Sequence, residues 1–557
     1  MKAVLLLLSI FLFVNDSILE ETSKPVVTTP LGKIKGTLIT SRLGKTIFSF
    51  RGIRYAKAPI GDLRFQPPVP VEKWDGVYDA TKDGPSCPQP TTDPISEDCL
   101  ILNVYSTKLP NSKNNPKRPV IVHIYPGGFY SSTSVSFWAG PQYFMDQDIV
   151  LVTFNYRIGS LGFISTGDEV APGNNGLKDQ VVVLKWVQQN IASFGGDPDS
   201  VTILGYSAGA WSVTLHMVSP MSEGLFHKGV SMSGTVFGAW PIPDHGQLEL
   251  AKKQARFVGC PENTTSADII KCLKTVSYQD LANSLVQFRE FGYDPVLVWS
   301  PVVEPNCEQQ RFLTDNPTKL IVTGKFKHIP FITGRTTDEF NYFALNVLEN
   351  DTLTQEMNND FDRIAPISFL YERNTDFSKY VSKNLRKFYF HDKKIDKSQE
   401  QALKDLYEDS IVGFQAHRAA KLIAQYNTKP VYYYRFSYRG SYSHLYLPGT
   451  NDTVPYGVVH HDDLIYLFYI SKLFPKFKEN SPKEVEMVEK LTLLYANFAK
   501  TGNPTPESST TLNEIKWQPY TPQDRKYLDI GEKLMMKENL LENRFQEWDR
   551  LYPINYL

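Results

Sequence analysis

The stretch GYSAGA (205–210) places a serine between two glycines, after the apolar run VTIL (201–204) and before a helical pattern. Glycines permit the strained backbone of a sharp strand-to-helix turn, which would lift the serine hydroxyl above the edge of a sheet. That hydroxyl is a weak nucleophile until a neighbouring base accepts its proton. The motif therefore predicts nucleophilic catalysis at Ser207, provided that a histidine and an acid join it. The simpler alternative is a small residue in a tight turn.

Histidine is the usual base for a serine nucleophile, and an acidic side chain orients its ring. The segment GVVHHDD (457–463) joins two histidines to two aspartates, and it lies beyond Ser207, as the order serine, acid, histidine requires. The clustering alone does not choose between His460 and His461. Spacing alone leaves Asp338 and Asp452 open as the acid.

The elements that must position these residues follow from hydrophobic periodicity. Strands are expected at 119–125, 148–156, 201–205, 431–438 and 526–531, with helices at 176–195 and directly after Ser207. Strands that alternate with helices indicate an α/β fold with a large, mostly parallel sheet covered by helices on both faces. Because no linker-like segment divides the chain, we expect one domain over 20–557.

The N-terminus resembles a secretory signal. Lys2 precedes an apolar run of 12 residues, 3–14, whereas a membrane span needs about 20. We therefore expect a signal peptide over 1–19 and a secreted protein without a membrane anchor. A buried first strand or helix is the alternative. The formal net charge of −1, with no long block of like charge, argues against nucleic acid as a partner.

Five cysteines suit an oxidising compartment, with two disulfides and Cys307 left over. Two pairs are each 12 positions apart, although composition does not settle the pairing: Cys87 with Cys99, and Cys260 with Cys272. Closing loops of this size contributes up to about 3 kcal/mol apiece in the chain-entropy model.

Short motifs in the expected mature chain include three glycosylation sequons and no metal-ligand spacing. Cysteine and histidine do not recur at the spacing of a zinc site, so no metal is expected. The sequons place expected glycans at Asn263, Asn350 and Asn451.

Seven blocks, in order along the chain, resemble the type-B carboxylesterase/cholinesterase family. They are RGIRYAKAPIGDLRF (51–65), SEDCLILNVY (96–105), YPGGFYSS (125–132), GNNGLKDQ (173–180), FGGDP (194–198), GYSAGA (205–210) and GVVHHDD (457–463). The resemblance covers nearly the whole mature chain and is greatest to secreted insect carboxylesterases. It implies the α/β-hydrolase fold, a serine esterase mechanism through an acyl-enzyme, and no cofactor.

The resemblance also implies which residues form the site. His460 becomes the base, and GRTTDEF (334–340) supplies the acid Glu339. The backbone N–H groups of Gly127, Gly128 and Ala208 would hold the oxyanion, each worth on the order of 3 kcal/mol. Pro126 stands where the family usually has glycine; it stiffens the loop but is not counted among the donors.

The pocket residues implied by the resemblance favour a lipophilic ester over a choline ester. Tyr206 stands where cholinesterases have glutamate, and the loop 87–99 lacks their tryptophan, which would hold a cation. Juvenile hormone esterases usually have glutamine at the place of Tyr206. Substrate contacts are expected at Trp240, Leu297, Trp299, Tyr342 and Phe343, with Phe340 in place of a common glycine.

Two matters stay open at this level. The natural ester could be hormone-like, volatile or xenobiotic, and the oligomeric state is unknown. The alternative function is an esterase-like binding or adhesion protein with a weak or inactive site.

Overall fold

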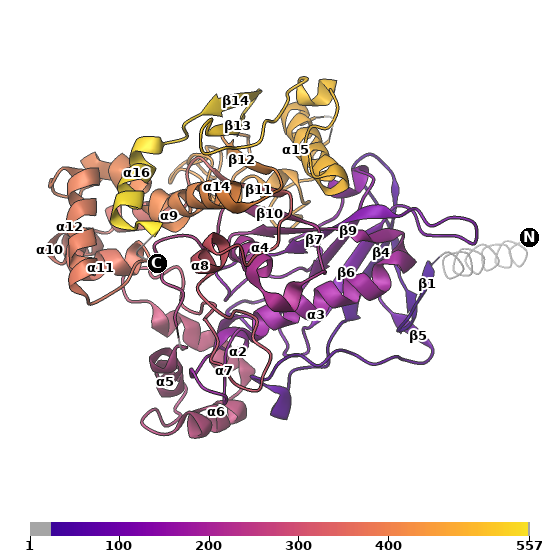
Figure 1. Cartoon of the computed structure of the whole chain (residues 1–557), viewed down its shortest axis with the longest axis horizontal. Helices are drawn as coiled ribbons and strands as arrows, with labels where there is room; N and C mark the ends of the chain where they lie inside the picture. The colour runs from indigo at the N-terminus through magenta and orange to yellow at the C-terminus, as the bar shows by residue number, and fades with distance from the viewer. Residues whose placement is uncertain (1–23, 245, 479, 555–557) are drawn as a thin grey trace, which may run out of the picture.

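The computed structural model describes residues 24–244, 246–478 and 480–554 (Figure 1). The expected signal peptide, 1–19, lies outside these residues. The described residues form an eleven-stranded sheet in the order β14-β13-β12-β11-β10-β9-β7-β8-β6-β4-β3, and a small sheet in the order β1-β2-β5. This is the architecture expected from the alternation of apolar runs.

The strands are short and mostly buried. The main sheet consists of β3 (Thr37–Thr40), β4 (Thr46–Arg54), β6 (Ile101–Ser106), β7 (Arg118–Ile124), β8 (Val150–Phe154), β9 (Gly196–Tyr206), β10 (Lys228–Met232), β11 (Phe331–Thr336), β12 (Val431–Phe436), β13 (Lys526–Ile530) and β14 (Leu534–Glu538). The small sheet consists of β1 (Val26–Thr29), β2 (Gly32–Lys35) and β5 (Val77–Asp79).

The centre of the main sheet is parallel and its edges are antiparallel. Strands β8, β7, β9, β10, β11, β12 and β13 pair in parallel. Antiparallel strands flank them on both sides: β6, β4 and β3 at one edge, β14 at the other. The expected strands at 119–125, 148–156, 431–438 and 526–531 appear with small shifts of their ends. Strand β9 is longer than expected because it begins at Gly196.

The helices connect and cover the strands. They are α2 (Gly159–Phe163), α3 (Asn175–Asn190), α4 (Ala208–Val218), α5 (Leu248–Phe257), α6 (Ser266–Thr275), α7 (Tyr278–Asn283), α8 (Pro317–Val322), α9 (Asn341–Leu348), α10 (Asp351–Asn359), α11 (Phe361–Ser368), α12 (Asp376–Phe390), α13 (Glu400–Glu408), α14 (Phe414–Tyr426), α15 (Pro482–Thr501) and α16 (Glu542–Leu551). A π-helical turn, η7 (Asp409–Gly413), joins α13 to α14.

Helices pack on both faces of the sheet, as the sequence predicts. Successive side chains of a strand point to opposite faces. Val122 and Ile203 pack with residues of α3, α4 and α14 in one core, whereas Ile121 and Leu204 pack with residues of α15 in another. Figure 1 shows α3 and α4 in front of the strands and α10, α11 and α12 together at the far end from β1. The fold is therefore the α/β-hydrolase fold.

Two disulfides close the local loops. Cys87 bonds to Cys99, and Cys260 bonds to Cys272 across α6. Cys307 is half-buried and carries a free thiol. Among the described residues, no helix combines the length and the apolar character needed to cross a bilayer.

Candidate active site

Ser207 lies at the turn between strand β9 and helix α4, where the sheet meets the helix layer. Its backbone has φ 54° and ψ −118°, a strained conformation for a residue with a side chain. The flanking glycines are required by close contacts: a Cβ on Gly205 would lie 2.0 Å from the Gly209 carbonyl oxygen, and one on Gly209 would lie 2.1 Å from that of Ile124. The motif therefore exists to make this tight turn.

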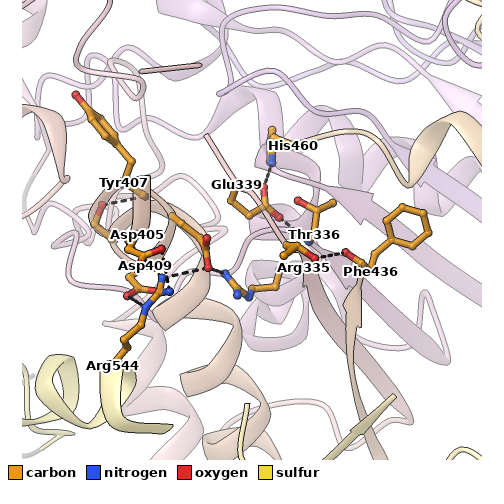
Figure 2. Close-up of polar contacts among 12 residues, drawn as sticks. Arg335, Thr336, Glu339, Asp405, Tyr407, Asp409, Phe436, His460 and Arg544 are labelled. Carbon is orange, nitrogen blue, oxygen red and sulfur yellow. Dashed lines mark hydrogen bonds and ion pairs between the residues drawn. The ribbon is translucent and has the colours of Figure 1, made fainter. Parts of the chain in front are cut away.

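His460 and Glu339 meet although they come from distant segments. The Nδ1 atom of His460 lies 2.5 Å from Oε2 of Glu339, as Figure 2 shows. The other oxygen, Oε1, accepts a hydrogen bond from the backbone N–H of Thr336 at 2.9 Å. The Nε2 atom of His460 is buried and has no hydrogen-bond partner within the described part of the chain. The ring is thus held at one nitrogen and open at the other.

The surroundings of Glu339 keep its side chain ionised. Burial acts to raise the pKa of this fully buried carboxyl. The charge and hydrogen bond of His460 outweigh burial, with a further hydrogen bond from the backbone N–H of Thr336, so the pKa lies below its ordinary value of 4.5. An ionised carboxylate beside Nδ1 stabilises a protonated imidazole, which a general base requires.

The other two candidate acids, Asp338 and Asp452, play different parts from Glu339. The backbone N–H of Asp338 donates to the Val458 carbonyl at 2.9 Å, and the Val458 N–H donates back to the Asp338 carboxylate at 2.8 Å. Asp338 thus ties together the two loops that carry Glu339 and His460, whereas Asp452 is exposed.

Ser207 lies near the pair of His460 and Glu339, because Tyr206 and Phe340 each adjoin both Ser207 and His460. The ring of Tyr206, the residue before Ser207, lies 5.0 Å from the His460 ring. Phe340 lines the same cavity as Ser207, and its ring lies 4.3 Å from that of His460. The fold therefore brings the three residues that the resemblance singled out to one place.

A buried ion network anchors the strand that leads to Glu339 (Figure 2). Arg335, at the end of β11, pairs with Glu408 on α13. Arg544 on α16 joins the network: its Nη2 lies 3.2 Å from Glu408, and its Nε lies 2.6 Å from Asp409. Because a buried charge without a partner is costly, this network holds β11 and the π-helical turn in one arrangement.

The glycine loop after β7 is shaped by contacts that exclude a side chain. Gly127 has φ 108°, and a Cβ there would lie 2.2 Å from the Ser131 carbonyl oxygen; Gly128 has φ 58°. The Gly127 carbonyl accepts hydrogen bonds from the backbone N–H groups of Tyr130 and Ser131. Gly128 and Ala208 line the cavity at Ser207. Gly127 and Pro126 line a larger hollow of about 380 Å³ next to it.

The cavity at Ser207 is narrow and apolar, with a volume of about 40 Å³. Of the five expected substrate contacts, the structure places only Leu297 in its wall. Trp299 lines a separate small hollow beside Tyr130. Trp240, Tyr342 and Phe343 do not line this cavity; Tyr342 is 43% exposed, and Phe343 packs behind Phe340.

Several wall residues escaped the sequence analysis. Trp211 lies one helical turn beyond Ser207, and this i, i+4 spacing could have identified it. Phe129 stands within the block YPGGFYSS, but no role was assigned to it. No motif marks the remaining ones, which come from segments far apart in the chain: Ser233, Val296, Leu370, Ile411, Val412 and Gln415. Ile411 and Val412 belong to the π-helical turn, a kind of irregularity that is frequent at functional sites.

Within the described ranges, no group of three histidine, cysteine or acidic side chains could hold a metal ion. The site combines a strained serine, a histidine held by a buried carboxylate, and an apolar cavity. This arrangement suits acyl transfer.

Comparison with known proteins identifies the family of the chain. Residues 23–548 match the sequence model of the carboxylesterase family. The chain is 35% identical over 527 residues to juvenile hormone esterase of Tribolium castaneum, an alignment that covers 91% of this chain and 88% of that protein. It is 37% identical over 523 residues to esterase FE4 of Myzus persicae, with 90% and 89% covered.

A solved structure gives the same result for the fold. The crystal structure of juvenile hormone esterase from Manduca sexta, with OTFP covalently attached, superposes with a TM-score of 0.83 at 30% identity and covers 95% of this chain and 100% of that one. The family resemblance seen in the seven sequence blocks is confirmed. The chain belongs to the carboxylesterase family and is a carboxylic ester hydrolase.

Proposed function

We propose that the protein is a secreted serine carboxylesterase in which Ser207 is the nucleophile, His460 the general base and Glu339 the acid that orients His460. The observation that carries this proposal is the 2.5 Å contact between His460 Nδ1 and Glu339, beside a serine in a strained turn. A histidine held at Nδ1 presents Nε2 as the base, and Nε2 is the nitrogen without a partner among the described residues.

The reaction follows from these positions. His460 Nε2 takes the hydroxyl proton of Ser207 while the serine oxygen bonds to the ester carbonyl carbon. The tetrahedral intermediate collapses, the bond to the alcohol oxygen breaks, and His460 gives its proton to the departing alcohol. Water then attacks the acyl-enzyme with His460 again as base, which releases the carboxylic acid and restores the serine.

The developing oxyanion needs donors that are already in place. The backbone N–H groups of Gly127, Gly128 and Ala208 are proposed for this role. Two facts support it: Gly128 and Ala208 line the cavity with Ser207, and the hydrogen bonds to the Gly127 carbonyl hold that part of the loop in one orientation.

The cavity favours a lipophilic ester. Its wall is apolar around Ser207, so burial of a hydrocarbon acyl group there is favourable, at about 0.8 kcal/mol for each CH₂. Leu297 is the expected contact that this cavity supports. The relatives include two proteins named juvenile hormone esterase, one with a compound covalently attached, which supports a lipophilic substrate and a covalent intermediate.

The further expectations about the chain also become proposals. Residues 20–557 are proposed to form one domain, because the main sheet takes its strands from Thr37 to Glu538. Secretion is supported by the apolar N-terminal run and by both disulfides. The three sequon asparagines are exposed, as glycosylation requires: Asn263, Asn350 and Asn451.

The proposal is tested by the hydrolysis of a short and a long p-nitrophenyl ester by the wild type, Ser207→Ala and Ser200→Ala. Ser200 lies on the same strand β9 but away from its carboxyl end. We expect Ser207→Ala to lose at least about 10⁴-fold in kcat, with Ser200→Ala close to the wild type. A fluorophosphonate probe should label Ser207 and no other serine.

Turnover retained by Ser207→Ala would contradict the nucleophile assignment. A folded wild type that hydrolyses neither ester and takes no label would point to the alternative, an esterase-like binding protein.

A further inference from the structure

Tyr206 precedes the proposed nucleophile, but its side chain turns away from the cavity. It is fully buried in the core under α15 and does not line the cavity at Ser207. A residue at this place in the chain is therefore not a wall of the substrate site. What it contacts is the segment that carries the proposed base.

The hydroxyl of Tyr206 accepts a hydrogen bond from the backbone N–H of His461 at 2.8 Å. That N–H belongs to the peptide that links His460 to His461. The Tyr206 ring also lies 5.0 Å from the rings of both histidines. His461 has φ 83°, a conformation that residues other than glycine rarely adopt. The hydroxyl of Tyr206 thus stabilises the His460–His461 peptide in this strained conformation.

The hydroxyl of Tyr206 stays protonated in this core. Burial raises the pKa of Tyr206 well above 10, so the phenol keeps its proton and can donate it. Ser233 and Asp463 lie near this hydroxyl, and Ser233 also lies near Glu339. Two contacts therefore act on His460 from different sides: the Glu339 carboxylate holds Nδ1, and the Tyr206 hydroxyl holds the backbone N–H of His461.

Glu339 alone leaves the histidine loop able to shift. A hydrogen bond at Nδ1 fixes the tautomer and one direction of the ring, but it does not fix the backbone on which the ring stands. Small displacements of a base relative to its nucleophile are costly, because proton transfer requires a separation within hydrogen-bond reach. A second fixed point near His460 therefore has a function.

We propose that Tyr206 is a positioning residue for the hydrolysis: its hydroxyl holds the His460–His461 peptide and thereby the aim of His460 Nε2 at Ser207. This inference rests on the proposed function, since it assigns a role relative to His460 as the base. It deepens that function by adding Tyr206 to Ser207, His460 and Glu339. Tyr206 itself touches neither the substrate nor the reacting atoms.

The test compares Tyr206→Phe with Tyr434→Phe. Tyr206→Phe removes only the hydroxyl and keeps the ring. Tyr434 is a matched control, because its buried hydroxyl donates to the Asp463 carboxylate at 3.2 Å in the same core. Rates are normalised to the sites titrated by a fluorophosphonate, so that misfolded protein does not count, and melting temperatures are measured for both variants.

We expect Tyr206→Phe to lower kcat about tenfold with KM nearly unchanged, and Tyr434→Phe to keep kcat within about twofold. Equal kcat in Tyr206→Phe and Tyr434→Phe would overturn the inference, as would a loss that disappears after active-site titration. Activity retained by Ser207→Ala would overturn the proposed function itself and this inference with it.

A second variant covers a failure of Tyr206→Phe to fold. Replacement of Tyr206 by 3,5-difluorotyrosine keeps the size of the ring and makes the hydroxyl a weaker acceptor for the His461 N–H. A lower kcat at unchanged KM supports the positioning role, and an unchanged kcat overturns it.

Discussion

The carboxylate of Glu339 lies 2.5 Å from Nδ1 of His460, although 121 positions separate the two residues in the chain. Each stands on a loop, and Asp338 ties the two loops together through hydrogen bonds in both directions with Val458. Behind Glu339, the buried pair of Arg335 and Glu408 anchors strand β11. The contact between Glu339 and His460 is therefore held in a rigid arrangement, so the effect of a substitution on it can be measured.

Glu339→Gln should lower kcat by about 10³- to 10⁴-fold with little change of KM, because a neutral amide cannot stabilise the imidazolium or enforce its tautomer. Asp338→Asn is the matched control for a change of charge on the same loop. Steady-state kinetics with a p-nitrophenyl ester measures both. If Asp338→Asn lowers kcat as much as Glu339→Gln does, the loss belongs to the loop as a whole and Glu339 has no specific role as the acid.

Asp463→Asn should stabilise the fold progressively as the pH rises from 5 to 8. Burial and then the charge of Glu339 raise the pKa of Asp463 to about 8 from 3.8. The folded state therefore holds a proton that the unfolded state releases above pH 4, so wild-type stability falls with pH by up to about 1.4 kcal/mol per unit. Asparagine does not titrate and escapes this loss.

Chemical denaturation of the wild type and Asp463→Asn at several pH values measures the difference. Asp529→Asn is the control. Burial alone would raise the pKa of Asp529, but its bonds to Arg435 and Lys537 lower it instead. Asp529 is then ionised over this pH range in both the folded and the unfolded protein. The effect of Asp529→Asn on stability should therefore not vary with pH. A pH-independent difference for Asp463→Asn would show that Asp463 is ionised in the folded protein.

Phe340→Gly should broaden the acyl preference without unfolding the protein. Phe340 has φ 57°, which costs a residue with a side chain about 1 kcal/mol and costs glycine nothing. Its ring also closes the cavity beside Ser207. We therefore expect a higher ratio of long-chain to short-chain ester hydrolysis.

Phe340→Ala separates the two effects. It opens the cavity equally but keeps the backbone strain, so it should be about 1 kcal/mol less stable than Phe340→Gly. An unchanged chain-length ratio in both variants would show that Phe340 does not limit the acyl group.

Gly127→Ala should abolish most activity. The new Cβ would lie 2.2 Å from the Ser131 carbonyl oxygen, so the glycine loop must move away from the position that we propose holds the oxyanion. Gly224→Ala is the control: its φ of 74° is strained in the same way, but nothing lies within 4 Å of the added carbon. Equal kcat values in Gly127→Ala and Gly224→Ala would show that the glycine loop takes no part in the mechanism.

Local sequence was sufficient to predict five strands of the main sheet and the turn at Ser207, but not strands such as β10 and β11. Runs of apolar, β-branched residues predicted strands such as β7 and β8, because side-chain periodicity is a property of neighbours in the chain. The same holds for Ser207, since its strained turn depends on Gly205 and Gly209 beside it. Glu339 needed the family resemblance, as spacing left Asp338 and Asp452 open.

Only the tertiary structure decided what lines the cavity and where Tyr206 points. Trp211 on α4 and Gln415 on α14 are 204 positions apart, yet their side chains share a 3.0 Å hydrogen bond in the cavity wall. Trp299 and Tyr342 looked equivalent in the sequence, and packing alone distinguishes them. Trp299 lines a separate small hollow, whereas Tyr342 is exposed. Contacts between distant segments depend on how whole elements pack, and no local pattern records that packing.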